Sequence, residues 1–185
     1  SMIKPRKFKE QVKIEAEAQI VKAHNMGVKL SHIDSHRHVH MIPSVFRVFK
    51  ELMQKYNIKK TRIMNENLFM TIKNNKDKSY LFDGGLIKYF LLLFFYMINS
   101  TKSDTYFYTM LYTCKLSKDR FKSVHIPKGY DSVEVMIHPG MPETDTNYKE
   151  DIFDNSIISD WRKKELETLL DKSVLNNFVL NLDMI

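Results

Sequence analysis

Hydrophobic residues recur every three or four positions in the first part of the chain, which is the spacing of an amphipathic helix. Pro5 suits the first turn of this helix, and Gly27 suits its end. The apolar positions that carry the pattern are Phe8, Val12, Ala16, Ile20 and Ala23. The same spacing predicts further helices over residues 43–56, 86–98 and 117–124 and from Ser159 onward.

Short runs with strand character alternate with these helices. Alternating, β-branched and aromatic residues predict strands over residues 28–36, 59–64, 105–111, 132–137 and 177–182. Polar and turn residues predict loops over residues 73–85 and 139–156. No internal repeat or linker interrupts this order. The alternation predicts an α/β fold, with a parallel sheet or barrel and crossover helices, in one domain over residues 1–185.

The most apolar segment, residues 89–98, reads Y-F-L-L-L-F-F-Y-M-I. It is too short to cross a bilayer, because a spanning helix needs about 20 residues. The segment therefore predicts a buried helix and no membrane span. A surface that contacts a partner or a membrane is the alternative interpretation.

Residues 31–40, S-H-I-D-S-H-R-H-V-H, hold four of the seven histidines in the chain. In an extended strand, alternate side chains lie about 6.6 Å apart, so the histidines would span about 26 Å. Because metal–ligand bonds are about 2.0–2.2 Å long, at most one or two of these residues would bind the same ion. Asp34 is a candidate to orient a ligating imidazole. A polar strand end with histidines bonded to backbone groups is the alternative interpretation.

His36 and His138 both fall where a predicted strand gives way to a loop. In parallel α/β folds, catalytic residues gather at the ends of the strands. The two positions therefore indicate one site built from two distant segments.

The formal net charge is +7, from 29 basic and 22 acidic residues. The basic residues are scattered among acidic ones, with no dense run and no nucleic-acid motif, so we expect no nucleic-acid partner. The positive balance would help to attract an anionic substrate. Cys114 is the single cysteine, which excludes a disulfide within the chain and fits a reducing compartment. No signal peptide is visible, so we expect a cytoplasmic location.

The histidine stretch, continued to Pro43, is similar to the signature of the YdjC-like carbohydrate deacetylases. It reads S-H-I-D-S-H-R-H-V-H-M-I-P. Two later segments resemble the family in the same order, V-M-I-H-P-G at residues 135–140 and R-K-K-E-L-E-T-L at residues 162–169. T-R-I at residues 61–63 resembles a strand that ends in R-I-P, although Met64 replaces the proline. The resemblance covers nearly the whole chain.

The resemblance implies a partial, deformed (β/α) barrel of the polysaccharide-deacetylase-like type. It implies a hydrolase that removes acetyl groups from N-acetylated sugars such as chitooligosaccharides. The family uses a divalent metal ion, Mg or Zn, held by one aspartate and two histidines. Such a metal polarises the amide carbonyl and lowers the pKa of the attacking water, while a carboxylate takes one proton and a histidine donates another.

The same resemblance implies roles for particular residues. His36 is the one metal ligand that the signature supplies here, and His138 is the general acid that protonates the leaving amine. Arg62 would orient a carboxylate or the substrate, with a surface ion pair as the alternative. Three other residues of the stretch would orient the metal ligand or contact the substrate, namely Asp34, His38 and His40.

The chain departs from the family pattern in two places. The family begins with a strand that ends in D-D-x-G and later has G-x-H-x-x-L, and neither motif occurs in this sequence. We therefore expect the chain to lack the N-terminal strands of the domain. We also expect it to lack the general base and the other metal ligands that those motifs supply. Little metal binding and little or no deacetylase activity are expected of the chain alone. An unpaired sheet edge would favour a homo-oligomer.

Two other functions stay open. H-x-H at a strand end also occurs in metal-dependent amidohydrolases and in PHP-type phosphoesterases, although here a helix precedes it and only His125 and His138 follow. Phosphate release from a phosphoester would favour this interpretation. The chain is alternatively a non-catalytic, truncated interaction module, which a measurement of its size in solution would test.

Overall fold

The computed structural model describes residues 5–74, 84–113, 115–122, 124–141 and 160–175. These residues belong to two compact units. The first unit draws on Ser1–Met64 and Leu92–Lys102, and the second draws on Asn65–Leu91 and Ser103–Asn181. Within the described residues, no helix has both the length and the hydrophobicity needed to cross a membrane.

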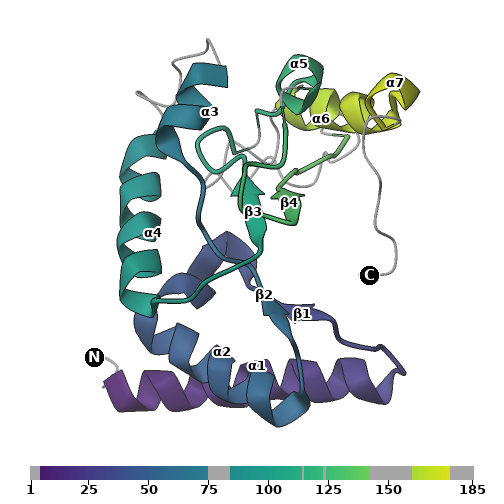
Figure 1. The fold of residues 1–185 in the computed structure, drawn as a ribbon. Coiled ribbons are helices and arrows are strands. Elements are labelled where there is room, and N and C mark those ends of the chain that lie inside the picture. The colour runs from purple at the N-terminus through teal and green to yellow at the C-terminus, as the bar shows by residue number, and fades with distance from the viewer. Residues whose placement is uncertain (1–4, 75–83, 114, 123, 142–159, 176–185) are drawn as a thin grey trace. The chain divides into compact units, whose positions relative to one another are not determined.

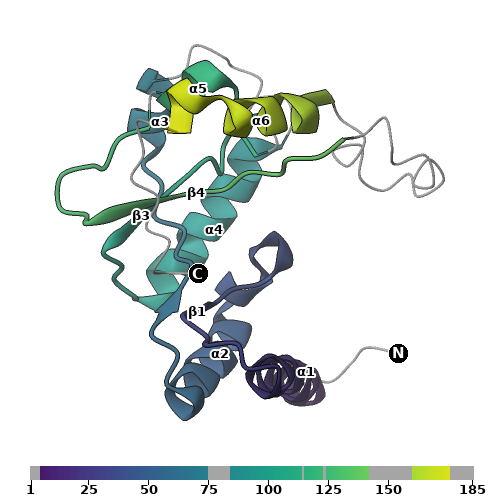
Figure 2. The same cartoon turned by 90° about the vertical axis from the view of Figure 1, so that its right-hand side faces the viewer.

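Two long helices lie side by side in the first unit, α1 (Pro5–Asn25) and α2 (Pro43–Tyr56), as Figures 1 and 2 show. Gly27, with φ of 80°, lets the chain turn away after α1. Asn57 ends α2 in the left-handed conformation. The helices enclose a small core of Ile20, Val48, Leu52 and Ile58. Both helices confirm the prediction from hydrophobic periodicity.

Strands β1 (His32–Ile33) and β2 (Lys60–Thr61) pair in parallel beside these helices, with Ile33 opposite Thr61. Both strands are shorter than the predicted ones over residues 28–36 and 59–64. The first strand ends early because the side chain of Ser35 bonds to His40, and the chain turns into a 3-10 helix, η1 (His36–Met41). The extended geometry assumed for the histidine stretch is therefore wrong beyond its first residues.

The second unit contains another parallel pair, β3 (Thr105–Tyr108) and β4 (Ser132–Val135), in register from Thr105 opposite Ser132 onward. Three short helices contact one another in this unit, namely α5 (Lys118–Lys122), α6 (Asp160–Leu170) and α7 (Lys172–Leu175). One hydrophobic core cluster of the unit contains Tyr106, Tyr108, Leu116, Phe121 and Val174. The helices predicted over residues 117–124 and after Ser159 are confirmed within the described residues.

Helix α3 (Leu68–Asn74) was not predicted from the hydrophobic pattern. Its start has a local signal, because the Oδ1 of Asn67 accepts a hydrogen bond from the N–H of Met70 at 3.0 Å, as an N-cap residue does. Most of the predicted loop over residues 73–85 lies outside the described residues. The same holds for most of the loop over residues 139–156, for Cys114 and for the predicted strand over residues 177–182.

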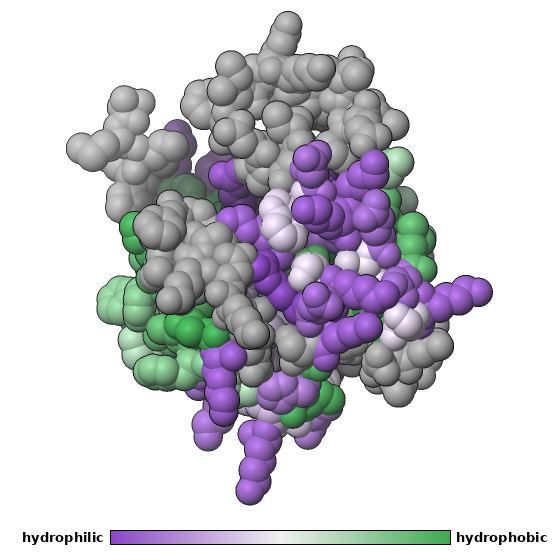
Figure 3. Space-filling model, turned by 90° about the horizontal axis from the view of Figure 1, so that it is seen from above, coloured by the Kyte–Doolittle hydropathy of each residue, from purple (hydrophilic) through white to green (hydrophobic). Residues whose placement is uncertain are grey.

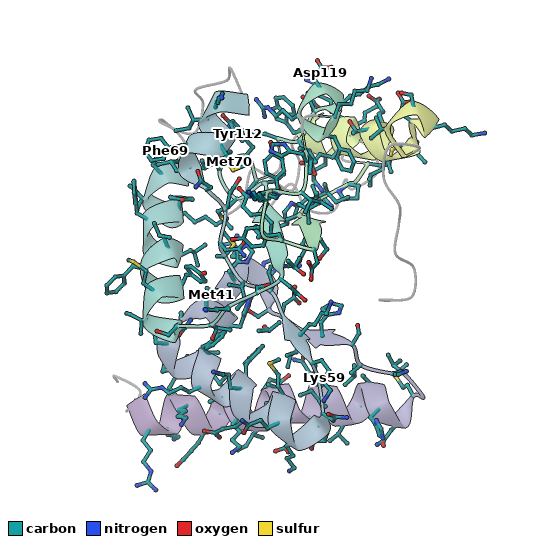
Figure 4. All side chains as sticks on the ribbon, in the orientation of Figure 1. Met41, Lys59, Phe69, Met70, Tyr112 and Asp119 are labelled. Carbon is teal, nitrogen blue, oxygen red and sulfur yellow. The ribbon has the colours of Figure 1, made fainter. Side chains whose placement is uncertain are left out.

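Helix α4 (Gly85–Asn99) confirms the predicted helix but corrects its burial. Tyr89 and Leu92 are buried, whereas other large apolar side chains of the helix are exposed, namely Ile87, Phe90, Leu91, Phe94, Met97 and Ile98. The helix is apolar on all sides, so its packed stripe covers only part of its apolar surface. Phe69 of α3, labelled in Figure 4, is 82% exposed. Figure 3 shows hydrophobic side chains gathered on the left-hand side of the face seen from above.

The observed sheets support the predicted α/β class in a coarse form. The described residues contain two separate two-stranded parallel sheets and no closed barrel. Parallel pairing through crossover helices is what the alternating sequence pattern predicted.

Candidate functional site

The histidine-rich segment forms a tight turn at the carboxyl end of β1. Ser35 is extended, and Arg37 and His38 then adopt left-handed backbone angles, with φ of 53° and 57°. This turn leaves His36 exposed and buries His38 and His40. Met41, labelled in Figure 4, ends η1 and is fully buried. The four histidines therefore do not share one environment.

His40 anchors this turn through both of its ring nitrogens. Nδ1 accepts hydrogen bonds from the N–H of Ser35 at 3.2 Å and from its hydroxyl at 2.9 Å. Because an N–H can only donate, Nδ1 carries no proton, and Nε2 donates to the carbonyl oxygen of Arg62 at 3.0 Å. Burial lowers the pKa of His40, against the raising effects of this hydrogen bond and of Asp34. His40 is thus a neutral structural link between the turn and the end of β2.

Asp34 and Arg62 form an ion pair of 2.6 Å at the same end of the sheet. The register of the strands explains it, since Ile33 pairs with Thr61 and each ion-pair residue comes next in the chain. Both side chains are mostly buried, with exposed fractions of 28% for Asp34 and 21% for Arg62. Arg62 therefore binds a carboxylate, and a role for it in orienting a carboxylate or the substrate during a reaction stays a prediction.

The described residues contain no group of three histidine, cysteine, aspartate or glutamate side chains that could hold a metal ion. His36 is exposed, both nitrogens of His40 are engaged, and the carboxylate of Asp34 is bound by Arg62. The described part of the chain therefore does not provide a complete ligand set for a metal ion.

His138 follows β4 in the second unit and is held by helix α6. Its N–H donates to the carboxylate of Glu165 at 2.5 Å, and its carbonyl oxygen accepts a hydrogen bond from Nε of Arg162 at 3.2 Å. The Nδ1 atom of its ring is buried, while the residue as a whole is half-buried. The histidine is therefore placed at the carboxyl end of a parallel strand, where α/β proteins carry their catalytic residues.

Glu66 is a buried carboxylate in the second unit that no sequence motif indicated. It accepts hydrogen bonds from the hydroxyl of Thr71 at 2.9 Å and from the N–H of Met110 at 2.8 Å. The N–H groups of Thr109 and Leu111 also donate to it, each at 3.3 Å. Burial raises the pKa of Glu66 to about 7, against the lowering effect of these hydrogen bonds. The carboxylate holds the turn after β3, where Thr109 has a positive φ of 86°.

Comparison with known families decides what this chain is related to. The sequence model of the family described as "YdjC-like protein" matches residues 2–178. The chain belongs to the YdjC-like protein family. A search of solved structures gave no significant match.

The YdjC-like chain is also similar to curated proteins that are named carbohydrate deacetylase. One from Clostridium beijerinckii is 28% identical over 168 residues, which cover 90% of this chain and 55% of that protein. One from Thermoanaerobacter pseudethanolicus is 43% identical over 49 residues, which cover 26% of the chain and 20% of that protein. One from Mus musculus is 40% identical over 57 residues, which cover 30% of the chain and 18% of that protein. The chain thus spans little more than half the length of the Clostridium relative.

The predicted site residues of the YdjC-like chain lie in both units. The first unit carries His36 and His38 and brings Asp34, Arg62 and His40 together. The second unit carries His138, and its contacts with Arg162 and Glu165 were not predicted. The R-x-x-E spacing indicated that Arg162 and Glu165 lie on one face of a helix, since residues three apart do so.

Proposed function

We propose that this chain carries residues of a metal-dependent hydrolase that removes acetyl groups from N-acetylated sugars of the chitooligosaccharide type. The observation that carries the proposal is the YdjC-like match over residues 2–178, together with relatives named carbohydrate deacetylase. The two parallel strand pairs are compatible with pieces of a deformed barrel in one domain. A cytoplasmic location and association through a sheet edge belong to the same proposal.

In the proposed reaction, His138 acts as the general acid. Its imidazole donates a proton to the amine that leaves when the amide C–N bond breaks. Arg62 holds the carboxylate of Asp34 at 2.6 Å and so fixes the polar end of the first sheet. His40 keeps the turn folded, and His38 is buried beside it, with ring centroids 6.2 Å apart.

His36 is the proposed metal ligand, for Mg or Zn. Its exposed side chain at the start of η1 supports this assignment, because a ligand must be open to the ion. A single imidazole binds a divalent ion weakly, since affinity depends on several fixed ligands. We therefore expect weak metal binding and low turnover from the 185-residue chain by itself.

Nuclear magnetic resonance of the ¹⁵N-labelled chain tests these assignments without requiring turnover. Zn or Mg should shift the signals of His36 and leave those of His24, on the exposed surface of α1, unchanged. Di-N-acetylchitobiose should shift the signals of His138, whereas the fully deacetylated disaccharide should not. The variants His36→Ala and His138→Ala should lose the respective responses.

Acetate release and phosphate release measured on the same preparation separate the alternatives. Acetate released from the N-acetylated sugar supports the proposed reaction. Phosphate released from a phosphoester, with no response to either sugar, would contradict it and favour the phosphoesterase.

A further inference from the structure

Helix α6 lies beside the backbone that leaves β4 (Figures 1 and 2). Two side chains from one turn of the helix form hydrogen bonds with that backbone. Arg162 and Glu165 are three residues apart and so project from the same helical face. Glu165 is 1% exposed, and its Oε2 accepts the hydrogen bond from the N–H of His138. Nε of Arg162 donates to the carbonyl oxygen of His138. Both backbone polar groups of His138 are therefore bound by α6.

Glu165 also ties His138 to the hydrophobic core of the unit. Its second carboxylate oxygen, Oε1, accepts a hydrogen bond from the N–H of Leu116 at 3.0 Å. Leu116 is 1% exposed and belongs to the core cluster with Tyr106 and Phe121. Burial raises the pKa of Glu165, while the two backbone hydrogen bonds and the charge of Arg162 lower it. The carboxylate thus bridges a core residue and the H-P-G segment.

Gly140 gives the guanidinium of Arg162 room to lie against this segment. A Cβ atom at Gly140 would stand 2.8 Å from the Cζ, Nε and Nη2 atoms of Arg162. The N–H of Gly140 donates to the carbonyl oxygen of Arg162 at 3.2 Å, and Nη2 of Arg162 lies 3.4 Å from the carbonyl oxygen of Pro139. A side chain at position 140 would therefore force the guanidinium of Arg162 to move.

We infer that Arg162 and Glu165 are positioning residues that fix the backbone of His138, so that helix α6 sets the direction of its imidazole. The inference rests on the proposed role of His138 as the general acid. With its N–H and C=O both bound, the ring can change direction only through its two side-chain torsions. This restriction matters because a general acid must come within about 2.6–3.2 Å of the atom that it protonates.

Amide hydrogen exchange of the ¹⁵N-labelled chain tests the inference, with three-bond couplings that report the χ1 rotamer of His138. Glu165→Ala should accelerate exchange at His138 and Leu116 by about tenfold or more, because both N–H groups lose a charged acceptor. The couplings of His138 should become averaged over rotamers. Glu165→Gln should restore protection at one of the two amides, since its side chain has one acceptor oxygen.

Matched variants separate positioning from general stability. Glu167→Gln changes an exposed carboxylate on the same helix and should leave both readouts of His138 unchanged. The amide of Phe107, which donates to Asn65 Oδ1 at 2.7 Å, serves as the reporter that the unit is still folded. Gly140→Ala should displace the guanidinium of Arg162 and average the His138 couplings while Glu165 stays in place.

Unchanged exchange and couplings at His138 in Glu165→Ala, with Phe107 still protected, would overturn the inference. If Glu165→Ala does not fold, Gly140→Ala and Arg162→Met decide, and a single His138 rotamer in both would overturn it equally. These readouts require no turnover. The variants can show the expected changes at His138 even if the chain neither binds nor deacetylates N-acetylated sugars. That result would contradict the proposed function and still support the positioning of His138 by Arg162 and Glu165.

Discussion

His40 donates a hydrogen bond from Nε2 to the carbonyl oxygen of Arg62 across 3.0 Å, and this contact joins the histidine-rich turn to the end of β2. The same ring accepts the N–H of Ser35 at Nδ1, so protonation of Nδ1 would place two donors against each other. The turn therefore depends on a neutral His40.

The contribution of His40 to stability should consequently be lost in mild acid. Burial lowers the pKa of His40 below its ordinary value of 6.5, with a smaller lowering effect from the charge of Arg62. The hydrogen bond to the Arg62 carbonyl and the charge of Asp34 act in the opposite direction. The unfolded chain therefore binds a proton below about pH 6.5 that the folded chain excludes, so this contribution to the free energy of unfolding is complete above that pH and is lost as the pH falls. Urea denaturation between about pH 5 and 8 should show this loss as a difference: relative to His40→Gln, the unmodified chain should lose stability as the pH falls. His24→Gln, on the surface of α1, is the control and should follow the pH dependence of the unmodified chain.

The ion pair of Asp34 and Arg62 should show a measurable coupling energy. Both side chains are mostly buried, so a double-mutant cycle with Asp34→Asn and Arg62→Met is expected to give about 1 kcal/mol, decreasing as salt is added. Arg6 and Glu10 on α1 form a matched pair at 3.2 Å with exposed fractions of 92% and 58%, and their cycle should show no measurable coupling. Equal couplings for the two pairs would contradict the assigned difference in burial.

Glu66 should produce a pH dependence of opposite sign. Burial raises the pKa of Glu66 from 4.5 to about 7, so the folded chain holds a proton that the unfolded chain releases in this range. Its contribution to stability is complete below pH 4.5 and is lost as the pH rises through 7, by about 3 kcal/mol. Denaturation curves of Glu66→Gln should lack this loss. A variant that retains the full loss would show that another group causes it.

Truncation of two phenylalanines in the second unit should change the free energy of unfolding by very different amounts. Phe69 is 82% exposed, so Phe69→Ser is expected to change the free energy of unfolding by less than about 0.5 kcal/mol. Phe107 is 1% exposed, and Phe107→Ala is expected to cost about 3–5 kcal/mol. Thermal denaturation of the two variants checks this contrast, and a large loss with Phe69→Ser would mean that another surface covers it.

Hydrophobic periodicity was sufficient to locate the long helices. It placed α2 at its observed bounds and α4 within one residue at each end, because a continuous apolar stripe defines a helix without reference to distant residues. The prediction of a strand over residues 28–36 was wrong in its length for a local reason. Ser35 and His40 form hydrogen bonds that turn the chain, so the strand does not continue to residue 36.

The carboxylates that support the second unit could not be predicted in the same way. Glu66 accepts hydrogen bonds from backbone N–H groups that lie 43 to 45 residues away in the chain, and Glu165 from groups 27 and 49 residues away. A backbone donor has no side-chain identity, so no residue pattern marks it. The motif signature did indicate His36 and His138, but only the structure shows which contacts hold His138 in place.

The left-handed backbone at Arg37 and His38 costs about 1–2 kcal/mol for each residue, because neither is a glycine. The bonds of His40 to Ser35 and to the carbonyl of Arg62 offset this strain, and the second of them comes from 22 residues away. A synthetic peptide of residues 31–43 would lack that partner and would not hold the turn in water. The histidine-rich motif therefore cannot be transplanted as a short metal-binding tag with its native geometry, however dense in histidine it is.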